Sequence, residues 1–171
     1  SCVLKLGGKT LKTGEFRGIA KVFENEPDAM TAIQSGVIVP GDVVVVRNVG
    51  PKGGPGMPEM VMLTIELQGR GLGKDVALIT DGRFSGVSHG ILIGHICPEA
   101  ADGGPLAAVK DGDIIVIDPV NRTLDVAIDD SELQRRMATI EPRELPSTIP
   151  QGSVLRRYSR HVSSAHYGCV Q

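Results

Sequence analysis

Residues 76–86 read Val-Ala-Leu-Ile-Thr-Asp-Gly-Arg-Phe-Ser-Gly, a mostly apolar run that passes directly into a polar turn. A run of this length bounded by turn residues is typical of a strand buried on both faces. A second such run, Val-Val-Val-Val at 43–46, lies upstream, and its β-branched side chains favour a strand. We therefore expect a sheet with buried central strands.

The flanking segments predict further strands and short helices. Strands are predicted at 16–23, 113–117 and 123–128. A helix follows Asn25 as cap, with Pro27 in its first turn and Gly36 at its end. Three more helices are predicted at 59–68, at 131–139 with Ser131 as cap, and at 152–165, which is rich in arginine. Strands outnumber long helices, so the sequence predicts a single β-rich α+β or barrel-like domain spanning residues 1–171.

Composition excludes several classes of protein. The 22 glycines and 11 prolines argue against a helical bundle. A net charge of −2 leaves no basic surplus for nucleic acid, and the apolar runs are too short to cross a membrane. The first five residues resemble no secretory signal and include no initiator Met, so we expect part of a longer protein.

The cysteines indicate a reducing compartment. Cys2, Cys97 and Cys169 are odd in number and have no CxxC spacing, unlike a disulfide framework or a local zinc site. Scattered structural thiols are a more frequent outcome than an iron–sulfur cluster held among them. We therefore expect a cytoplasmic location.

A glycine-rich loop at residues 50–58, Gly-Pro-Lys-Gly-Gly-Pro-Gly-Met-Pro, is the first candidate site. Glycines let backbone N–H groups approach an anion closely, as in phosphate and carboxylate cradles, and Lys52 adds a positive charge. The Walker and GxGxxG patterns are absent. An anion cradle including Lys52, Gly53 and Gly54 and a plain irregular turn both remain open.

Polar residues near this loop and after the strand at 76–80 also allow two interpretations each. Glu59 is either a carboxylate that interacts favourably with the dipole at a helix start or an oxygen ligand of a Mg²⁺ ion. Ser85, beside Gly86, is either a turn hydroxyl or a catalytic group, although the GxSxG elbow is not matched. Asp81 and Arg83 form a local ion pair or bind an acidic substrate.

The histidines give no sharper assignment. His89, His95, His161 and His166 are available as bases, but spacing places none beside Ser85. His95 and Cys97 allow a metal interpretation, although a buried histidine and a small buried thiol are more frequent.

Taken in order, the motifs resemble one family, the dihydroxy-acid dehydratases and their phosphogluconate and sugar-acid relatives. The matching stretches are Gly-Pro-Lys-Gly-Gly-Pro-Gly-Met-Pro-Glu-Met (50–60), Leu-Ile-Thr-Asp-Gly-Arg-Phe-Ser-Gly (78–86), Gly-His-Ile-Cys-Pro-Glu-Ala-Ala-Asp-Gly-Gly-Pro (94–105), Asp-Gly-Asp-Ile-Ile (111–115) and Val-Ser-Ser-Ala (162–165). The resemblance covers nearly the whole chain and implies a swivelling β-barrel-like domain with flanking helices.

The resemblance also implies a reaction, the dehydration of a 2,3-dihydroxy acid to a 2-oxo acid in branched-chain amino-acid synthesis. It assigns Ser85 as the proton acceptor at C2 and Glu59 as one Mg²⁺ ligand. Lys52, Gly53, Gly54, Asp81, Arg83 and Gly86 are the candidate substrate-binding residues. An iron–sulfur cluster acting as Lewis acid helps the C3 hydroxyl to leave.

The resemblance places the rest of the site elsewhere. The cluster cysteines, and the Asp and carbamylated Lys that complete the Mg²⁺ site, belong to an N-terminal domain that this sequence does not contain. The chain alone is therefore expected to be inactive and to bind no cluster. Its expected partners are that N-terminal domain, a small hydroxy acid and further copies in a homo-oligomer, with neither nucleic acid nor membrane.

Two alternatives remain open. The Met57-Pro58-Glu59 variation is associated more with sugar-acid members of the family. The other alternative is a protein without catalysis, either a module whose glycine loop holds a small anion or a structural domain that docks a partner chain through exposed apolar surface.

Overall fold

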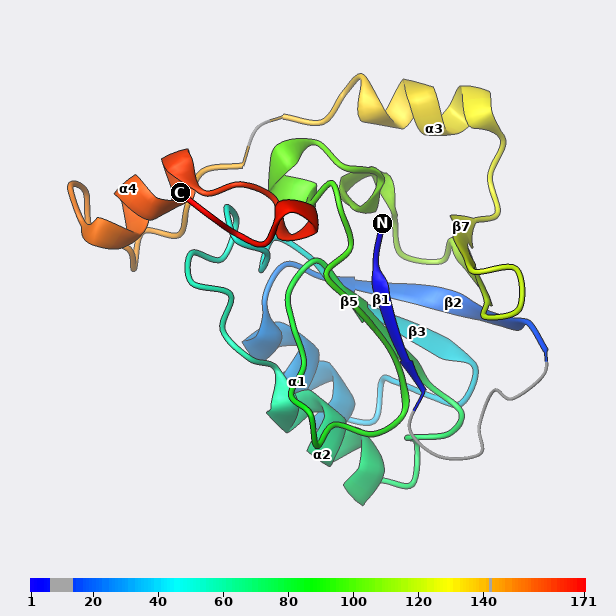
Figure 1. Ribbon diagram of the computed structural model, residues 1–171. Coiled ribbons are helices and arrows are strands. Elements are labelled where there is room, and N and C mark those ends of the chain that lie inside the picture. Colours follow the sequence, from blue (N-terminus) through cyan, green and yellow to red (C-terminus); the bar gives the residue numbers. More distant parts are fainter. Residues whose placement is uncertain (7–13, 142) are drawn as a thin grey trace.

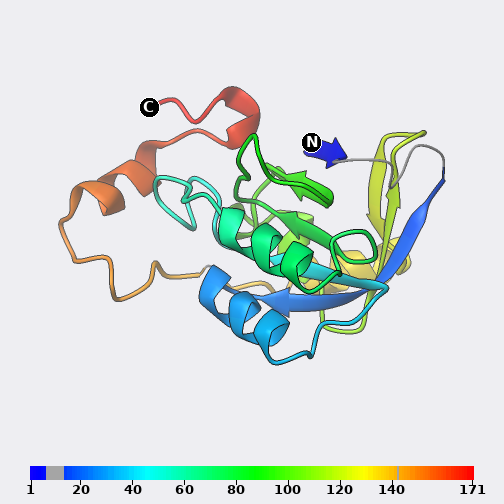
Figure 2. The same cartoon turned by 90° about the horizontal axis from the view of Figure 1, so that it is seen from below.

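A seven-stranded mixed sheet forms the centre of the computed structural model, which describes residues 1–6, 14–141 and 143–171. The strand order is β1-β5-β4-β3-β2-β6-β7. The strands span β1 Val3–Leu6, β2 Phe16–Phe23, β3 Asp42–Val46, β4 Ala77–Thr80, β5 Ile91–Gly94, β6 Ile114–Asp118 and β7 Thr123–Val126. The sheet curls into a half-barrel (Figures 1 and 2). The predicted β-rich, barrel-like α+β fold with flanking helices is confirmed.

The four central strands run parallel. β2 pairs with β3, β3 with β4 and β4 with β5 in parallel register, whereas β1, β6 and β7 join antiparallel at the edges. Every residue of β3, β4 and β5 is buried, as the apolar runs at 43–46 and 76–80 predict. Since parallel strands end at the same edge, the loops after β3, β4 and β5 meet there.

Two α-helices cover one face of the sheet, and two 3-10 helices and a third α-helix lie on the other. α1 (Glu26–Gln34) and α2 (Val61–Gly69) pack side by side on one face, where Ile33 and Leu63 meet Val44 and Leu78 (Figures 1 and 2). On the other face lie the 3-10 helices η1 (Ala100–Asp102) and η2 (Pro105–Ala108) and then α3 (Asp130–Met137). Alternating residues of each buried strand thus supply two separate cores.

Several predicted boundaries need correction. α2 begins at Val61, so Glu59 is not a helix-start residue but lies in an isolated bridge with Arg83. Asp129, and not Ser131, caps α3, because its side chain accepts from the Glu132 N–H. The predicted strand at 123–128 ends at 126, and the predicted basic helix at 152–165 is α4 (Val154–His161), followed by η3 (Ala165–Tyr167).

Two strands, β1 and β5, were not predicted. The cap of α1 is confirmed, since the Asn25 side chain accepts from the Asp28 N–H at 2.9 Å. No helix among the described residues is both long and apolar enough to cross a bilayer.

Candidate active site

Asp81 joins the three loops that leave the carboxyl ends of the parallel strands. Its fully buried carboxylate accepts hydrogen bonds from the backbone N–H groups of Asn48, Val49 and Ala100 at 2.9–3.0 Å. These donors follow β3 and β5, whereas Asp81 itself follows β4. Burial raises the pKa of Asp81, although the backbone hydrogen bonds oppose the rise. Asp81, a predicted substrate-binding residue, is therefore buried between the loops, and its hydrogen bonds hold their backbones together.

The glycine loop does cradle an anion, and the anion is the side chain of Glu99. This carboxylate, 1% exposed, accepts from the Lys52 N–H at 3.0 and 3.1 Å and from the Gly53 N–H at 2.9 Å. A Cβ on Gly50 would lie 2.6 Å from a Glu99 carboxylate oxygen, so a larger residue there would have to displace the Glu99 carboxylate. The Lys52 ammonium pairs with Asp102 at 2.6 Å. Glu99 is the structural residue that sequence reasoning missed.

Glu59 and Arg83 lie side by side where the glycine loop meets the turn after β4. Arg83 donates from Nε to the Met57 carbonyl at 2.7 Å, and its carbonyl accepts from the Met60 N–H at 3.2 Å. The guanidinium lies 3.8 Å from the Glu59 carboxylate, and both side chains are partly exposed. The structure thus brings together two predicted residues that are 24 positions apart in the sequence. They meet at the carboxyl ends of the parallel strands.

Ser85 lies two residues beyond Arg83 in the same turn and is half-buried. Its Oγ accepts from the Val87 N–H at 3.2 Å and lies 3.3 Å from Oγ of the buried Ser88. Among the described residues no histidine is hydrogen-bonded to this hydroxyl, so the geometry here is not that of a Ser–His hydrolase. Gly86, the neighbouring candidate, is exposed.

His95 adds a nitrogen base to the same edge, directly after β5. It is half-buried, not buried as expected, and adopts a left-handed backbone with φ of 55°. Burial, together with the nearby Arg83 charge, lowers the pKa of His95. Its imidazole is therefore neutral at neutral pH.

A metal would find one carboxylate here rather than a complete set of ligands. No three His, Cys, Asp or Glu side chains within the described ranges are grouped so that they could hold a metal ion. Glu59, partly exposed and in a loop, can present one carboxylate oxygen to Mg²⁺, which accepts a few carboxylates together with water and substrate oxygens. Cys2, Cys97 and Cys169 are free thiols.

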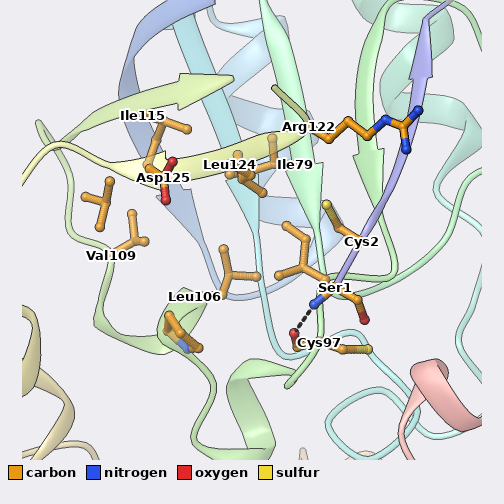
Figure 3. A pocket seen from close by; sticks show the side chains of 13 residues that line it. Ser1, Cys2, Ile79, Cys97, Leu106, Val109, Ile115, Arg122, Leu124 and Asp125 are labelled. Carbon is orange, nitrogen blue, oxygen red and sulfur yellow. Dashed lines mark hydrogen bonds between the residues drawn. The ribbon is translucent and has the colours of Figure 1, made fainter. Parts of the chain in front are cut away.

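A hollow lined mostly by apolar side chains lies apart from these residues. It is a pocket of about 490 Å³ whose lining includes Ile79, Leu106 and Leu124, which Figure 3 draws among the lining side chains. A second pocket of about 570 Å³ includes Lys52 and Asp102 beside the C-terminal Ser163–Tyr167 segment. The first contains none of the predicted site residues, which lie in the loops that follow β3 and β4.

Comparisons with known proteins agree with the motif assignment. The family model described as dihydroxy-acid/6-phosphogluconate dehydratase C-terminal matches residues 1–169. A dihydroxy-acid dehydratase of Aeropyrum pernix is 49% identical over 98% of this chain, and one of Pyrococcus furiosus is 52% identical over 91%. One of Methylococcus capsulatus is 51% identical over 98%. The matched parts are 29%, 27% and 29% of those relatives' own lengths, so this chain spans less than a third of each. The chain belongs to the dihydroxy-acid/6-phosphogluconate dehydratase C-terminal domain family.

Proposed function

We propose that this chain is the C-terminal part of a dihydroxy-acid dehydratase and supplies the proton acceptor of the reaction, Ser85. The observation that carries the proposal is the meeting of the two motif loops: Glu59 lies beside Arg83, and Arg83 precedes Ser85 by two residues in the same turn. The relatives of about 50% identity that carry the name dihydroxy-acid dehydratase support it.

The proposed reaction is a β-elimination of water. Ser85 removes the proton at C2 of a 2,3-dihydroxy acid, the C3 hydroxyl leaves, and the enol becomes a 2-oxo acid. A serine hydroxyl is a weak base and can accept the C2 proton only as its alkoxide, so the negative charge of that alkoxide needs stabilisation by nearby donors or cations. The Val87 N–H, which donates to Ser85 Oγ at 3.2 Å, is one such donor. Arg83, whose side chain is 44% exposed, would bind the carboxylate of the acidic substrate.

The loops around the glycine-rich segment have a supporting role in this proposal. Lys52, Gly53 and Gly54 remain candidates for substrate contact, but the Lys52 and Gly53 N–H groups already serve Glu99. A cradle filled by an internal carboxylate argues against the alternative of a free-standing module that binds small anions there. We propose instead that the cradle holds the loop in the shape that presents Glu59.

Mg²⁺ and an iron–sulfur cluster complete the proposed enzyme. Glu59 would provide one Mg²⁺ ligand, while the other ligands and the cluster cysteines come from the N-terminal part. When bound, these groups supply Lewis acidity toward the substrate oxygens. The assembly we propose is a homo-oligomer in the reducing cytoplasm, a setting supported by the three free thiols.

Substitution of Ser85 in the full-length protein tests the proposal. Ser85→Ala should lower 2-oxo acid formation from a branched 2,3-dihydroxy acid by at least about 100-fold, with an unchanged iron–sulfur absorbance. Ser35→Ala, at the distant C-terminal cap of α1, should leave the rate unchanged. Retained turnover in Ser85→Ala would remove the assignment. Assaying an aldonic acid in parallel distinguishes the branched-chain from the sugar-acid substrate, which the Met57-Pro58-Glu59 variation keeps open.

A further inference from the structure

Lys5 contacts the turn that carries Ser85 from a distant part of the sequence. It lies in the edge strand β1, opposite Leu92 of β5 in the antiparallel register (Figure 1). Its ammonium donates to the Ser85 carbonyl at 2.9 Å and to the carbonyl of Gly86. One cation therefore holds two successive carbonyl groups of the turn.

The second of these carbonyls is connected to the serine hydroxyl through a single peptide group. The Gly86 carbonyl and the Val87 N–H belong to the same peptide unit, and that N–H donates to Ser85 Oγ at 3.2 Å. A cation bound to the oxygen of a peptide group polarises it and strengthens the hydrogen bond that its N–H donates. The chain of contacts therefore runs from Lys5 through the 86–87 peptide to the Ser85 oxygen.

We propose that Lys5 is a positioning residue for Ser85, acting through the Gly86–Val87 peptide group to orient the serine oxygen and to stabilise negative charge on it. The inference rests on the proposed role of Ser85 as proton acceptor. Lys5 does not need to touch the substrate. Its effect arises because the polarised N–H is a better donor to the alkoxide form of Ser85, the form in which Oγ can accept a proton.

Besides Lys5, the Ser88 N–H holds this turn by donating to the Ser85 carbonyl at 3.4 Å. Val87 is 72% exposed and Gly86 is exposed, so few packing contacts fix the 86–87 peptide. On its inner side the serine oxygen meets the buried Ser88 hydroxyl at 3.3 Å. Loss of the Lys5 ammonium would free the peptide to rotate and would weaken the donor that serves Oγ.

The test uses the full-length enzyme, normalised by its iron–sulfur absorbance. Lys5→Met keeps the length of the side chain and removes the charge, Lys5→Arg keeps the charge, and Lys74→Met makes the same change on the exposed turn before β4. For Lys5→Met we expect kcat to fall by about 10- to 100-fold, with KM changed by less than about threefold. Lys5→Arg should recover much of the rate, and Lys74→Met should behave as the wild type.

The deuterium isotope effect separates positioning from a merely structural role. With a substrate deuterated at C2, the isotope effect on kcat should rise in Lys5→Met, because proton abstraction becomes slower relative to the other steps. An unchanged kcat, or a lower kcat with an unchanged isotope effect, would overturn the inference. If Lys5→Met does not fold, Lys5→Gln replaces it under the same criteria.

Ser85→Ala measured alongside keeps the two proposals distinct. If Ser85→Ala retains turnover, the proposed function fails, and the Lys5 inference fails with it. If Ser85→Ala is inactive while Lys5→Met has a wild-type rate and isotope effect, the Lys5 inference alone is wrong.

Discussion

The carboxylate of Glu99 accepts a hydrogen bond from the Gly53 N–H at 2.9 Å, 46 residues away in the sequence. The Lys52 N–H donates to the same carboxylate. A glycine-rich loop that by its sequence suits an external anion is therefore folded around an internal one. The distinction matters because it makes the loop's shape depend on a buried charge.

Gly50→Ala should destabilise the chain, because the new Cβ would lie 2.6 Å from a Glu99 oxygen and 3.1 Å from the Asp81 carbonyl oxygen. We expect a loss of about 1–3 kcal/mol in the free energy of unfolding, measured in urea. Gly69→Ala is the matched control, since a Cβ there meets nothing within 4 Å and Gly69 ends α2. That variant should be neutral or slightly stabilising. Equal effects of the two variants would contradict the close packing at Gly50.

Glu99→Gln should change the pH dependence of stability. Burial raises the folded-state pKa of Glu99 above its ordinary value of 4.5, despite the hydrogen bonds from Gly53 and Lys52 that lower it. Between those two pKa values the folded chain binds more protons than the unfolded chain, so this group's contribution to stability increases as the pH falls. Glutamine does not titrate.

Urea unfolding of the wild type and Glu99→Gln from pH 7 downward measures this contribution. The wild type should gain stability relative to Glu99→Gln as the pH falls, and the difference should level off below about 4.5. A difference that stays constant, or that moves against the wild type on acidification, would show that the pKa of Glu99 is not raised.

Strands β3 and β4 of the central sheet could be predicted from the sequence because each is a continuous run of mostly apolar residues. Residues 43–46 and 76–80 need no knowledge of their neighbours to be recognised as buried strands. β5 cannot be recognised because Ile91-Leu92-Ile93 is short and lies between glycines. β1 cannot be recognised because it is a four-residue edge strand whose strand partner, β5, is distant in the sequence. The cap of α3 was misplaced because Asp129, Asp130 and Ser131 are all good capping residues.

The site residues also divide into those that sequence motifs identify and those whose contacts depend on the fold. Motif resemblance was enough to single out Ser85 and Glu59, whose roles stay predictions. The contacts of Glu99 and Lys5 could not be predicted, because the fold brings each to its partner across 46 and 80 residues. Glu99 had one available signal, since a carboxylate in the turn-rich 94–105 stretch needs donors if it is buried.

Arg136→Met should destabilise the packing of α3 against the sheet. The Arg136 guanidinium forms two hydrogen bonds with the Asp113 carboxylate, and both side chains are nearly buried, at 12% and 10% exposure. We expect a loss of about 1–3 kcal/mol near neutral pH. Arg122→Met, an exposed residue in the β6–β7 turn, is the control and should have little effect.

Acid should reduce the difference between Arg136→Met and the wild type. Although burial alone would raise it, the hydrogen bonds from Arg136 lower the pKa of Asp113 below its ordinary value of 3.8. The contribution of the ion pair is therefore present above pH 3.8 and is lost as the pH falls through the folded-state pKa. If the two proteins still differ as much at the lowest pH at which they fold, the ion pair is not the source of the stability.

Mg²⁺ should bind this chain far more weakly than it binds the full-length protein. Glu59 lies 3.8 Å from the cation Arg83, and among the described residues no three His, Cys, Asp or Glu side chains are grouped so that they could hold a metal ion. Mg²⁺ releases its water reluctantly and needs several oxygen ligands, so one partly exposed carboxylate gives little affinity. Titration calorimetry of the 171-residue chain should give no saturation up to about millimolar Mg²⁺, whereas the full-length protein should saturate and its Glu59→Gln variant should bind more weakly. Tight binding to the isolated chain would mean that the complete ligand set lies within these 171 residues, and the division of the site between two domains would then be wrong.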